Sequence, residues 1–306
     1  MLWHLLALAA LQSRTAAIPV KTRVQPSLAD KIDRVRSSVV QIVIRLEDPN
    51  ALVPPQWKDC FKEARCVAGT GFFINQAGDV ATAGHVGLSV SQVLQDLRAR
   101  GVSATALMSV PYPNLDVHGK GVSGEIALNF QEYPIKPRAQ DIARDLFVYS
   151  PARNNPFTDH AALFGVKDKG FQLSPQVAPI APARVRDGDD ILACGFPLGS
   201  DALISTVGHV AASWARENLL TARNNGISEE SDVYNLDLRT NPGNSGGPVF
   251  RLSDQSVIGV DVEVRTADGG SSEGVAVAVP SKYLVELLKS SGIEWREAWS
   301  PQAGKS

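Results

Sequence analysis

The residue with the clearest chemical signature is Ser245, which lies in the segment NPGNSGGPVF at 241–250. Glycine accepts positive φ angles and leaves its surroundings uncluttered, so this segment predicts a tight turn with an accessible serine hydroxyl. If the backbone N–H groups of Gly243 and Ser245 point to one spot, they form an oxyanion hole, in which each donor contributes about 3 kcal/mol. The segment therefore indicates a nucleophilic serine, against the alternative of a glycine-rich hairpin loop with an incidental serine.

A serine nucleophile needs a base within hydrogen-bonding distance and a carboxylate that orients this base. Among the five histidines, His85 is favoured, because it closes the strand-like segment VATAGHV and would lie at the end of a hairpin, where catalytic side chains gather. The others lie in the N-terminal segment or in strand and linker contexts: His4, His118, His160 and His209. For the carboxylate we favour Asp145, which directly precedes the apolar segment LFVYS, over its neighbour Asp141.

Composition excludes several classes of function. Of the 306 residues, 44% are hydrophobic and 20% are charged, with 25 Gly and 19 Pro, which is typical of a globular protein rich in strands and turns. The formal net charge of -2 and the lack of a long basic run argue against binding to nucleic acid. No metal-ligand cluster, phosphate loop or dinucleotide fingerprint is present, so neither a metal nor another cofactor is expected.

Short strands separated by turn residues dominate the pattern. In the first half they are expected at 39–44, 68–74, 116–118, 124–130 and 145–150, with a surface helix inserted at 88–101. A Pro-, Asn- and Asp-rich stretch predicts a linker at 156–184 between an N-terminal domain at 30–155 and a C-terminal domain at 185–292. The strands of the second half indicate a barrel or a sandwich. A last helix is expected from Ser281, as its N-cap, to Gly292, followed by a tail at 293–306.

The N-terminal residues and the cysteines indicate the cellular compartment in which the protein is located. Residues 1–17 combine a short apolar run with the small residues Thr15, Ala16 and Ala17, which predicts a signal peptide and a secreted, periplasmic or cell-envelope protein. The alternative is an N-terminal helix that stays attached. No other segment approaches the length of a membrane span. Cys60 and Cys66 bracket five residues and could staple a hairpin in an oxidising compartment, whereas Cys194 lies in an apolar strand, as a buried thiol would.

Four segments together resemble trypsin-like peptidases of the HtrA (high-temperature-requirement) type. GTGFFINQAGDVATAGHV is similar to their histidine segment, and DIARDLFVYS to their aspartate segment. VRDGDDILACGFPLG with STVGHVAAS is similar to the start of their second barrel, and NPGNSGGPVF with SVIGV to their serine segment. The segments occur in the order of the family and span roughly residues 37 to 290.

This resemblance implies an all-β fold of two six-stranded antiparallel barrels, with a C-terminal helix and a short inserted helix. It implies a serine endopeptidase with His85 as general base, Asp145 as its orienting carboxylate, Ser245 as nucleophile, and Gly243 with Ser245 as oxyanion donors. Protein or peptide substrates would bind extended, as an added strand near Val260 to Val264. The family's usual PDZ domains have no room after the last helix, so PDZ-gated regulation is not expected.

Specificity and activity leave alternatives open. The serine segment also resembles that of glutamyl endopeptidases, and Arg239 in the specificity pocket would favour an acidic P1 side chain, whereas Asp261 would favour a basic one. Both could instead pair with each other or face solvent. A protease-fold module that binds without cutting and an esterase with the same triad are the competing functions. The α/β-hydrolase order of serine, acid and histidine is reversed here, which makes that fold a poor match.

Overall fold

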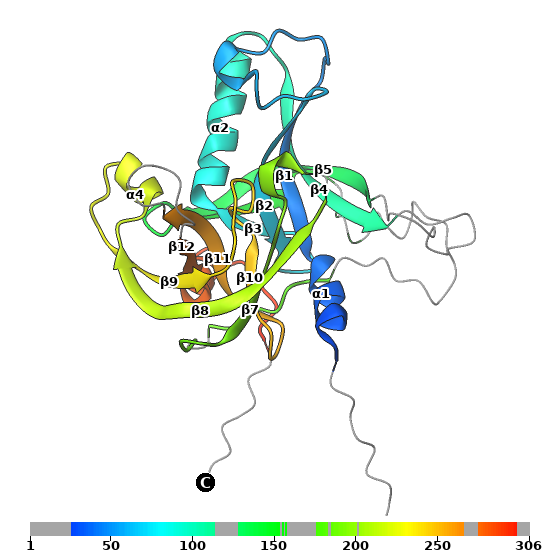
Figure 1. Cartoon of the computed structure of the whole chain (residues 1–306). Helices are drawn as coiled ribbons and strands as arrows, with labels where there is room; N and C mark the ends of the chain where they lie inside the picture. Colours follow the sequence, from blue (N-terminus) through cyan, green and yellow to red (C-terminus); the bar gives the residue numbers. More distant parts are fainter. Residues whose placement is uncertain are drawn as a thin grey trace, which may run out of the picture.

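The computed structural model describes residues 26–113, 128–153, 155, 157, 176–182, 185–200, 202–265 and 275–298. These residues form two closed antiparallel barrels of six strands each (Figure 1). The structure therefore confirms the fold class expected from the sequence. The predicted signal peptide, the strand expected at 116–118 and most of the predicted linker lie outside the described residues.

The first barrel is closed in the order β1-β2-β3-β6-β5-β4. Its strands are β1 (Val39–Leu46), β2 (Arg65–Phe73), β3 (Val80–Ala83), β4 (Ala104–Pro113), β5 (Leu128–Asp141) and β6 (Leu146–Pro151). Every residue of β1 except Arg45 is buried, because its β-branched side chains fill both the barrel interior and the layer that packs on it. The short β3 pairs with β2 and with β6, and it delivers the chain to the site described below.

The second barrel repeats this plan in the order β10-β11-β12-β9-β8-β7. Its strands are β7 (Asp190–Gly195), β8 (Ile204–Glu217), β9 (Ser231–Asp237), β10 (Pro248–Arg251), β11 (Ser256–Arg265) and β12 (Val275–Pro280). The 3-10 turn η2 (Pro197–Gly199) lies between β7 and β8, and the short helix α4 (Leu220–Asn224) lies between β8 and β9. Buried valine, isoleucine and leucine side chains from several of these strands form the core of this barrel.

The helix expected at 88–101 is α2 (Gly84–Ala99), which begins directly after β3. Sequence reasoning placed this start too late, because the apolar run through His85 looks like a continued strand. Ala83 is the last extended residue, with φ -72° and ψ 150°, so His85 lies in the first turn of the helix and not at the end of a hairpin strand. In Figure 1, α2 rises alongside the first barrel, and the 3-10 turn η1 (Pro55–Trp57) lies near its far end, where Trp57 Nε1 donates to Asp96.

Several elements were not predicted from the sequence, among them α1 (Leu28–Arg36), β4 and the short helix α4, and one predicted strand was too short. The helix α1 begins with a capping box between Ser27 and Asp30, and β4 is a full strand of the first barrel. The strand expected to end at residue 130 continues to Asp141 in β5. Prolines normally interrupt a strand, but the register of β5 shifts between Pro137 and Ala139, and such an irregularity accommodates a proline.

The last helix, α5 (Ser281–Ser290), begins where it was expected but is not capped as expected. Its N-cap is Pro280, and the Ser281 hydroxyl instead donates to the backbone oxygen of Ala181. Gly292, with φ +62°, follows the helix end in the left-handed conformation. Beyond it, the described part of the predicted tail is bound to the protein: Arg296 N–H donates to Ile74 O at 2.9 Å.

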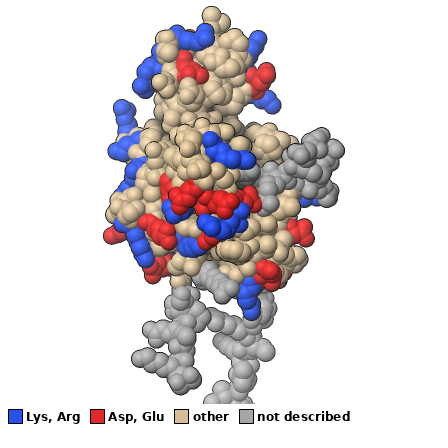
Figure 2. All heavy atoms as spheres, turned by 90° about the vertical axis from the view of Figure 1, so that its left-hand side faces the viewer, with Lys and Arg blue, Asp and Glu red and all other residues tan. Residues whose placement is uncertain are grey.

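None of the described helices combines the length and the apolar character that crossing a membrane requires. Acidic and basic side chains are interspersed on the face shown in Figure 2, in keeping with the formal net charge of -2. A uniform field of one sign therefore does not cover this face of the molecule.

Candidate active site

His85 and Asp145 meet at the end of β3. Backbone pairing of Ala83 with Leu146 brings the start of α2 beside the turn that precedes β6. The two Asp145 carboxylate oxygens both contact His85: Oδ1 accepts from the backbone N–H at 2.7 Å, and Oδ2 lies 2.8 Å from Nδ1. The Asp145 side chain is 4% exposed and that of His85 is 38% exposed, so the imidazole is oriented from a buried side while its other edge remains accessible.

The local backbone is shaped to allow this contact. Asp145 has φ +53°, a left-handed conformation that is uncommon outside glycine and clusters at functional sites. A Cβ on Gly84 would lie 2.8 Å from Asp145 Oδ1, so only glycine lets the carboxylate approach this closely. The competing carboxylate Asp141 is engaged elsewhere, because its Oδ2 accepts from Arg144 Nη1 at 2.9 Å.

Ser245 lies in the loop 238–247 between β9 and β10 of the second barrel, here called the serine loop. This loop packs on the end of β3. Ser245 O accepts from the backbone N–H of Thr70 in β2 at 2.9 Å. The next residue, Gly246, has φ +85°, and a Cβ there would lie 2.1 Å from Thr82 Oγ1 and 2.7 Å from Ala83 N. A glycine at this position therefore brings the serine loop against the strand that ends just before His85.

Gly243 has φ +102°, and a Cβ there would lie 2.5 Å from Phe196 O. The preceding carbonyl, Pro242 O, accepts from Leu198 N–H at 2.7 Å. In a trans peptide the N–H points opposite to the C=O. The Gly243 N–H therefore points away from Leu198, as a donor to a bound group would.

Asp261 lies beneath this loop and is 3% exposed. Its backbone oxygen accepts from Gly246 N–H at 2.6 Å, its N–H donates to Gly247 O at 2.9 Å, and its Oδ2 accepts from Thr240 Oγ1 at 2.6 Å. Burial raises the pKa of the Asp261 carboxyl to about 6, against opposing effects of Thr240 and His85. Asp261 thus supports the serine loop, whereas Arg239, the other charged candidate, is exposed two residues beyond the end of β9.

The remaining candidates are separate from this cluster. Cys60 and Cys66 are joined in a disulfide, with their Cα atoms 5.0 Å apart. Cys194 is buried, and burial raises the pKa of its thiol to about 11, which keeps it protonated and unreactive. His209 lies on β8, where it contacts Asp190 at 3.0 Å. His4, His118 and His160 lie outside the described residues. Within the described part of the chain, no three His, Cys, Asp or Glu side chains form a group suited to a metal ion.

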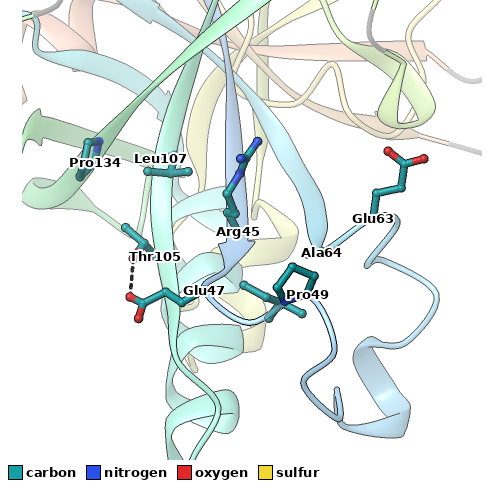
Figure 3. Close-up of a pocket in the computed structure, with 9 residues that line it drawn as sticks. Arg45, Glu47, Pro49, Glu63, Ala64, Thr105, Leu107 and Pro134 are labelled. Atoms are coloured by element: carbon teal, nitrogen blue, oxygen red, sulfur yellow. Dashed lines mark hydrogen bonds between the residues drawn. The ribbon is translucent and has the colours of Figure 1, made fainter.

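A cavity of about 570 Å³ lies on the first barrel, and none of His85, Asp145 and Ser245 lines it. Its walls carry both signs of charge, and Thr105 donates to Glu47 across one side at 3.3 Å (Figure 3). Glu63 and Ala64, which lie within the disulfide loop and have positive φ, form another side. This cavity therefore belongs to the disulfide end of the barrel rather than to the candidate site.

Sequence reasoning missed Thr70, which touches the serine loop through both its backbone and its side chain. Its Oγ1 donates to Gly243 O at 2.7 Å and accepts from Phe196 N–H at 3.0 Å. The only signal in the sequence was the GTG tripeptide at 69–71, which predicted a strand but not this contact.

A family model described as a trypsin-like peptidase domain matches residues 69–260, which is more than half of the chain. A probable periplasmic serine endoprotease DegP-like of Marinomonas sp. (strain MWYL1) is 38% identical over 116 residues, covering 36% of this chain and 22% of that protein. A serine protease Do-like HtrA of Lactococcus lactis subsp. cremoris (strain MG1363) is 32% identical over 104 residues, covering 33% of this chain and 25% of that one.

Among solved structures, the HtrA-type protease AlgW with decapeptide superposes with a TM-score of 0.55 at 18% identity. The match covers 87% of this chain and 67% of that one. Identity at this level supports the shared fold alone. The chain also spans only about a quarter or less of the length of the curated relatives named above.

Proposed function

The chain belongs to the trypsin-like peptidase family, and on this premise we propose that it is a serine endopeptidase with His85, Asp145 and Ser245 as its catalytic triad. The observation that carries the proposal is the double contact of Asp145 with His85, through Nδ1 and through the backbone N–H. A carboxylate bound to Nδ1–H leaves Nε2 as the basic nitrogen, which is the tautomer that a serine hydroxyl requires.

In the proposed reaction, His85 Nε2 takes the Ser245 proton while Ser245 Oγ attacks the carbonyl carbon of a peptide bond. The buried Asp145 carboxylate stabilises the imidazolium that forms. His85 then gives the proton to the leaving amine, and the C–N bond breaks to leave an acyl-enzyme on Ser245. Water activated by the same imidazole releases the acyl group and restores the hydroxyl.

The negative oxygen of the tetrahedral intermediate would be bound by the N–H groups of Gly243 and Ser245. The orientation of the Pro242–Gly243 peptide supports this assignment, because Leu198 holds its carbonyl on the opposite side. Donors that are already fixed before the reaction stabilise developing charge without reorganisation, which is the main source of catalysis in such sites.

An extended peptide would add to β11. Beyond Val260, where its pairing with β10 ends, β11 continues to pair with β12 on its other side. The backbone that follows Asp261 thus has one edge without a strand partner among the described residues, and peptides commonly bind such edges. Because Asp261 is buried and Arg239 is exposed, an acidic P1 side chain is the preference that we propose.

A periplasmic or cell-envelope location, or secretion, is part of the same proposal. Relatives matched here are described as periplasmic. The disulfide between Cys60 and Cys66 is of the kind that persists in oxidising compartments.

The test combines covalent labelling with cleavage of a peptide library by the wild type and by Ser245→Ala. We expect a fluorophosphonate probe to label the wild type and not the variant, and we expect library cleavage to disappear with the hydroxyl. Enrichment of Asp and Glu at P1 would support the role of Arg239. Absence of labelling and of peptide cleavage under all conditions would instead favour a protease-fold binding module, and cleavage of short acyl esters alone would favour an esterase.

A further inference from the structure

The GTG tripeptide of β2 lies directly against the serine loop. A Cβ on Gly69 would lie 2.7 Å from Val86 Cγ2 and 3.0 Å from Ser245 O, and one on Gly71 would lie 2.6 Å from Val80 Cγ1. Side chains are therefore excluded on both sides of Thr70, which itself is fully buried. Gly69 lets the backbone of the first barrel approach the loop closely enough for Thr70 to reach it, whereas Gly71 makes room for Val80 within that barrel.

Thr70 makes three hydrogen bonds across the boundary between the barrels. Its backbone N–H donates to Ser245 O at 2.9 Å, and its hydroxyl donates to Gly243 O at 2.7 Å. The same hydroxyl accepts from Phe196 N–H at 3.0 Å. A threonine hydroxyl has a single proton to donate, so this geometry commits that proton to the carbonyl of Gly243.

These bonds hold the backbone on both sides of the Ser245 N–H and directly after the Gly243 N–H. The carbonyls of Gly243 and Ser245 are both turned toward Thr70, and the Ser245 N–H lies between them in the chain. The hydroxyl also ties Gly243 to Phe196, whose carbonyl leaves no room for a side chain at Gly243. Two residues beyond Phe196, Leu198 fixes the peptide that carries the Gly243 N–H.

We propose that Thr70 is a positioning residue of the active site: its hydroxyl keeps the Gly243 and Ser245 N–H groups aimed at the oxyanion. This inference rests on the proposed peptidase function. Thr70 does not touch the reacting atoms and acts through the loop, so its loss should impair the transition state more than the binding of substrate.

The matched variants are Thr70→Val and Thr70→Ser. Valine keeps the shape of threonine but lacks the hydroxyl, and serine keeps the hydroxyl but lacks the methyl group. With a peptide substrate taken from the library, we expect Thr70→Val to lower kcat by roughly 10- to 100-fold, which is less than the 10²–10³-fold cost of losing a donor outright. KM should stay within about twofold, and Thr70→Ser should retain kcat within about threefold of the wild type.

Circular dichroism and thermal unfolding show whether each variant is folded, and fluorophosphonate labelling rates report attack by Ser245 independently of substrate binding. If Thr70→Val does not fold, Thr70→Cys replaces it with a thiol that donates and accepts only weakly, and the same loss of kcat is expected. If a folded variant without the hydroxyl keeps the wild-type kcat, or if Thr70→Ser loses as much kcat as Thr70→Val, this inference is overturned but the proposed function is not. A wild type that neither cleaves nor labels would overturn the proposed function and this inference with it.

Discussion

Asp145 shows how much of the candidate site depends on the surroundings of one residue. Its backbone adopts an uncommon conformation, and both of its oxygens are used by His85. A strained conformation of this kind costs of order 1–3 kcal/mol and persists where the surroundings fix it. The cost is offset here by the two short hydrogen bonds to a single histidine.

We expect Asp145→Asn to lower kcat on a peptide substrate by about 10⁴-fold with little change in fold, because the amide no longer selects the tautomer with a basic Nε2. Asp141→Asn is the matched control, since Asp141 binds Arg144 in the same turn and should alter kcat by no more than a few fold. Steady-state kinetics of both variants show whether the loss of kcat is specific to the Asp145 carboxylate. Equal losses would show that the turn, and not the carboxylate at position 145, limits activity.

Asp261 makes stability depend on pH. Its carboxyl has a pKa of about 6 in the folded protein, because burial raises it from the ordinary value of 3.8. The folded state therefore binds this proton more tightly than the unfolded state, and the stabilisation is complete below about pH 4 and is lost as pH rises through 6.

In Asp261→Asn this contribution is removed, while the amide still accepts from Thr240 through its oxygen. Unfolding in urea from pH 4 to pH 8 should show the free energy of unfolding of the wild type falling relative to that of the variant as pH increases. A difference that is constant over this range, or that grows in favour of the wild type, would contradict the raised pKa.

Residue types and their spacing pointed to His85, Asp145 and Ser245, because a serine in a glycine-rich turn and an aspartate before a strand are local signals. The contact of Thr70 with Gly243 has no such signal, since 173 positions separate the two residues in the chain. The burial of Asp261 likewise depends on how the serine loop folds over β11. Neither could be inferred before the two barrels were placed together.

At the scale of elements, α2 is the clearest difference between pattern and structure. Gly84 and Gly87 have low helix propensity, yet they occupy its first turn. The reason is tertiary, because a Cβ on Gly87 would lie 2.3 Å from Phe147 Cδ2 in β6. Strand periodicity located most β-strands, whereas this helix start is set by packing on a strand that is distant in sequence.

Gly87→Ala should therefore destabilise the protein, although alanine is the better helix former by up to about 1 kcal/mol. Overpacking against Phe147 costs about 1–3 kcal/mol and outweighs that gain. Ser89→Ala, at an exposed position of the same helix, is the control and should be neutral or slightly stabilising. Thermal unfolding measures both, and a rise in Tm for Gly87→Ala would show that β6 yields to the added methyl group.

At the scale of the whole molecule, the residues of the proposed triad are divided between the two barrels, so the docking of the barrels decides whether the proposed site forms. The repeated pattern of short strands predicted two β domains, because that signal is carried by local sequence. The segment 293–298 was expected to be part of a tail, but it bridges the barrels. This connection depends on backbone pairing between residues far apart in the chain, including a parallel β-bridge between Ile180 and Glu297. Side-chain periodicity in the sequence does not encode such pairing.

The bridging segment makes contacts on both sides. Arg296 N–H donates to Ile74 O at the end of β2, and Asn75 Nδ2 donates to Glu294 O at 2.8 Å. On the other side, Ile180 N–H donates to Arg296 O at 2.8 Å, and Ala298 N–H donates to Ile180 O at 2.9 Å; the residue after Ile180, Ala181, donates its own N–H to Val257 O in β11 at 3.0 Å. Through residues 180–181, the segment thus connects the end of the strand that carries Thr70 to the barrel that carries Ser245.

Deletion of residues 294–306 should lower both Tm and kcat/KM, whereas deletion of 299–306 leaves these hydrogen bonds in place and serves as the control. At about 1 kcal/mol for each lost hydrogen bond, the longer deletion costs several kcal/mol, which corresponds to roughly 5–10 °C in Tm for a chain of this size. Activity should fall at temperatures where the deleted protein is still folded, because the barrels carry different members of the proposed triad. Unchanged kcat/KM in the longer deletion would show that the remaining contacts between the barrels, those of Thr70 among them, are sufficient to assemble the site.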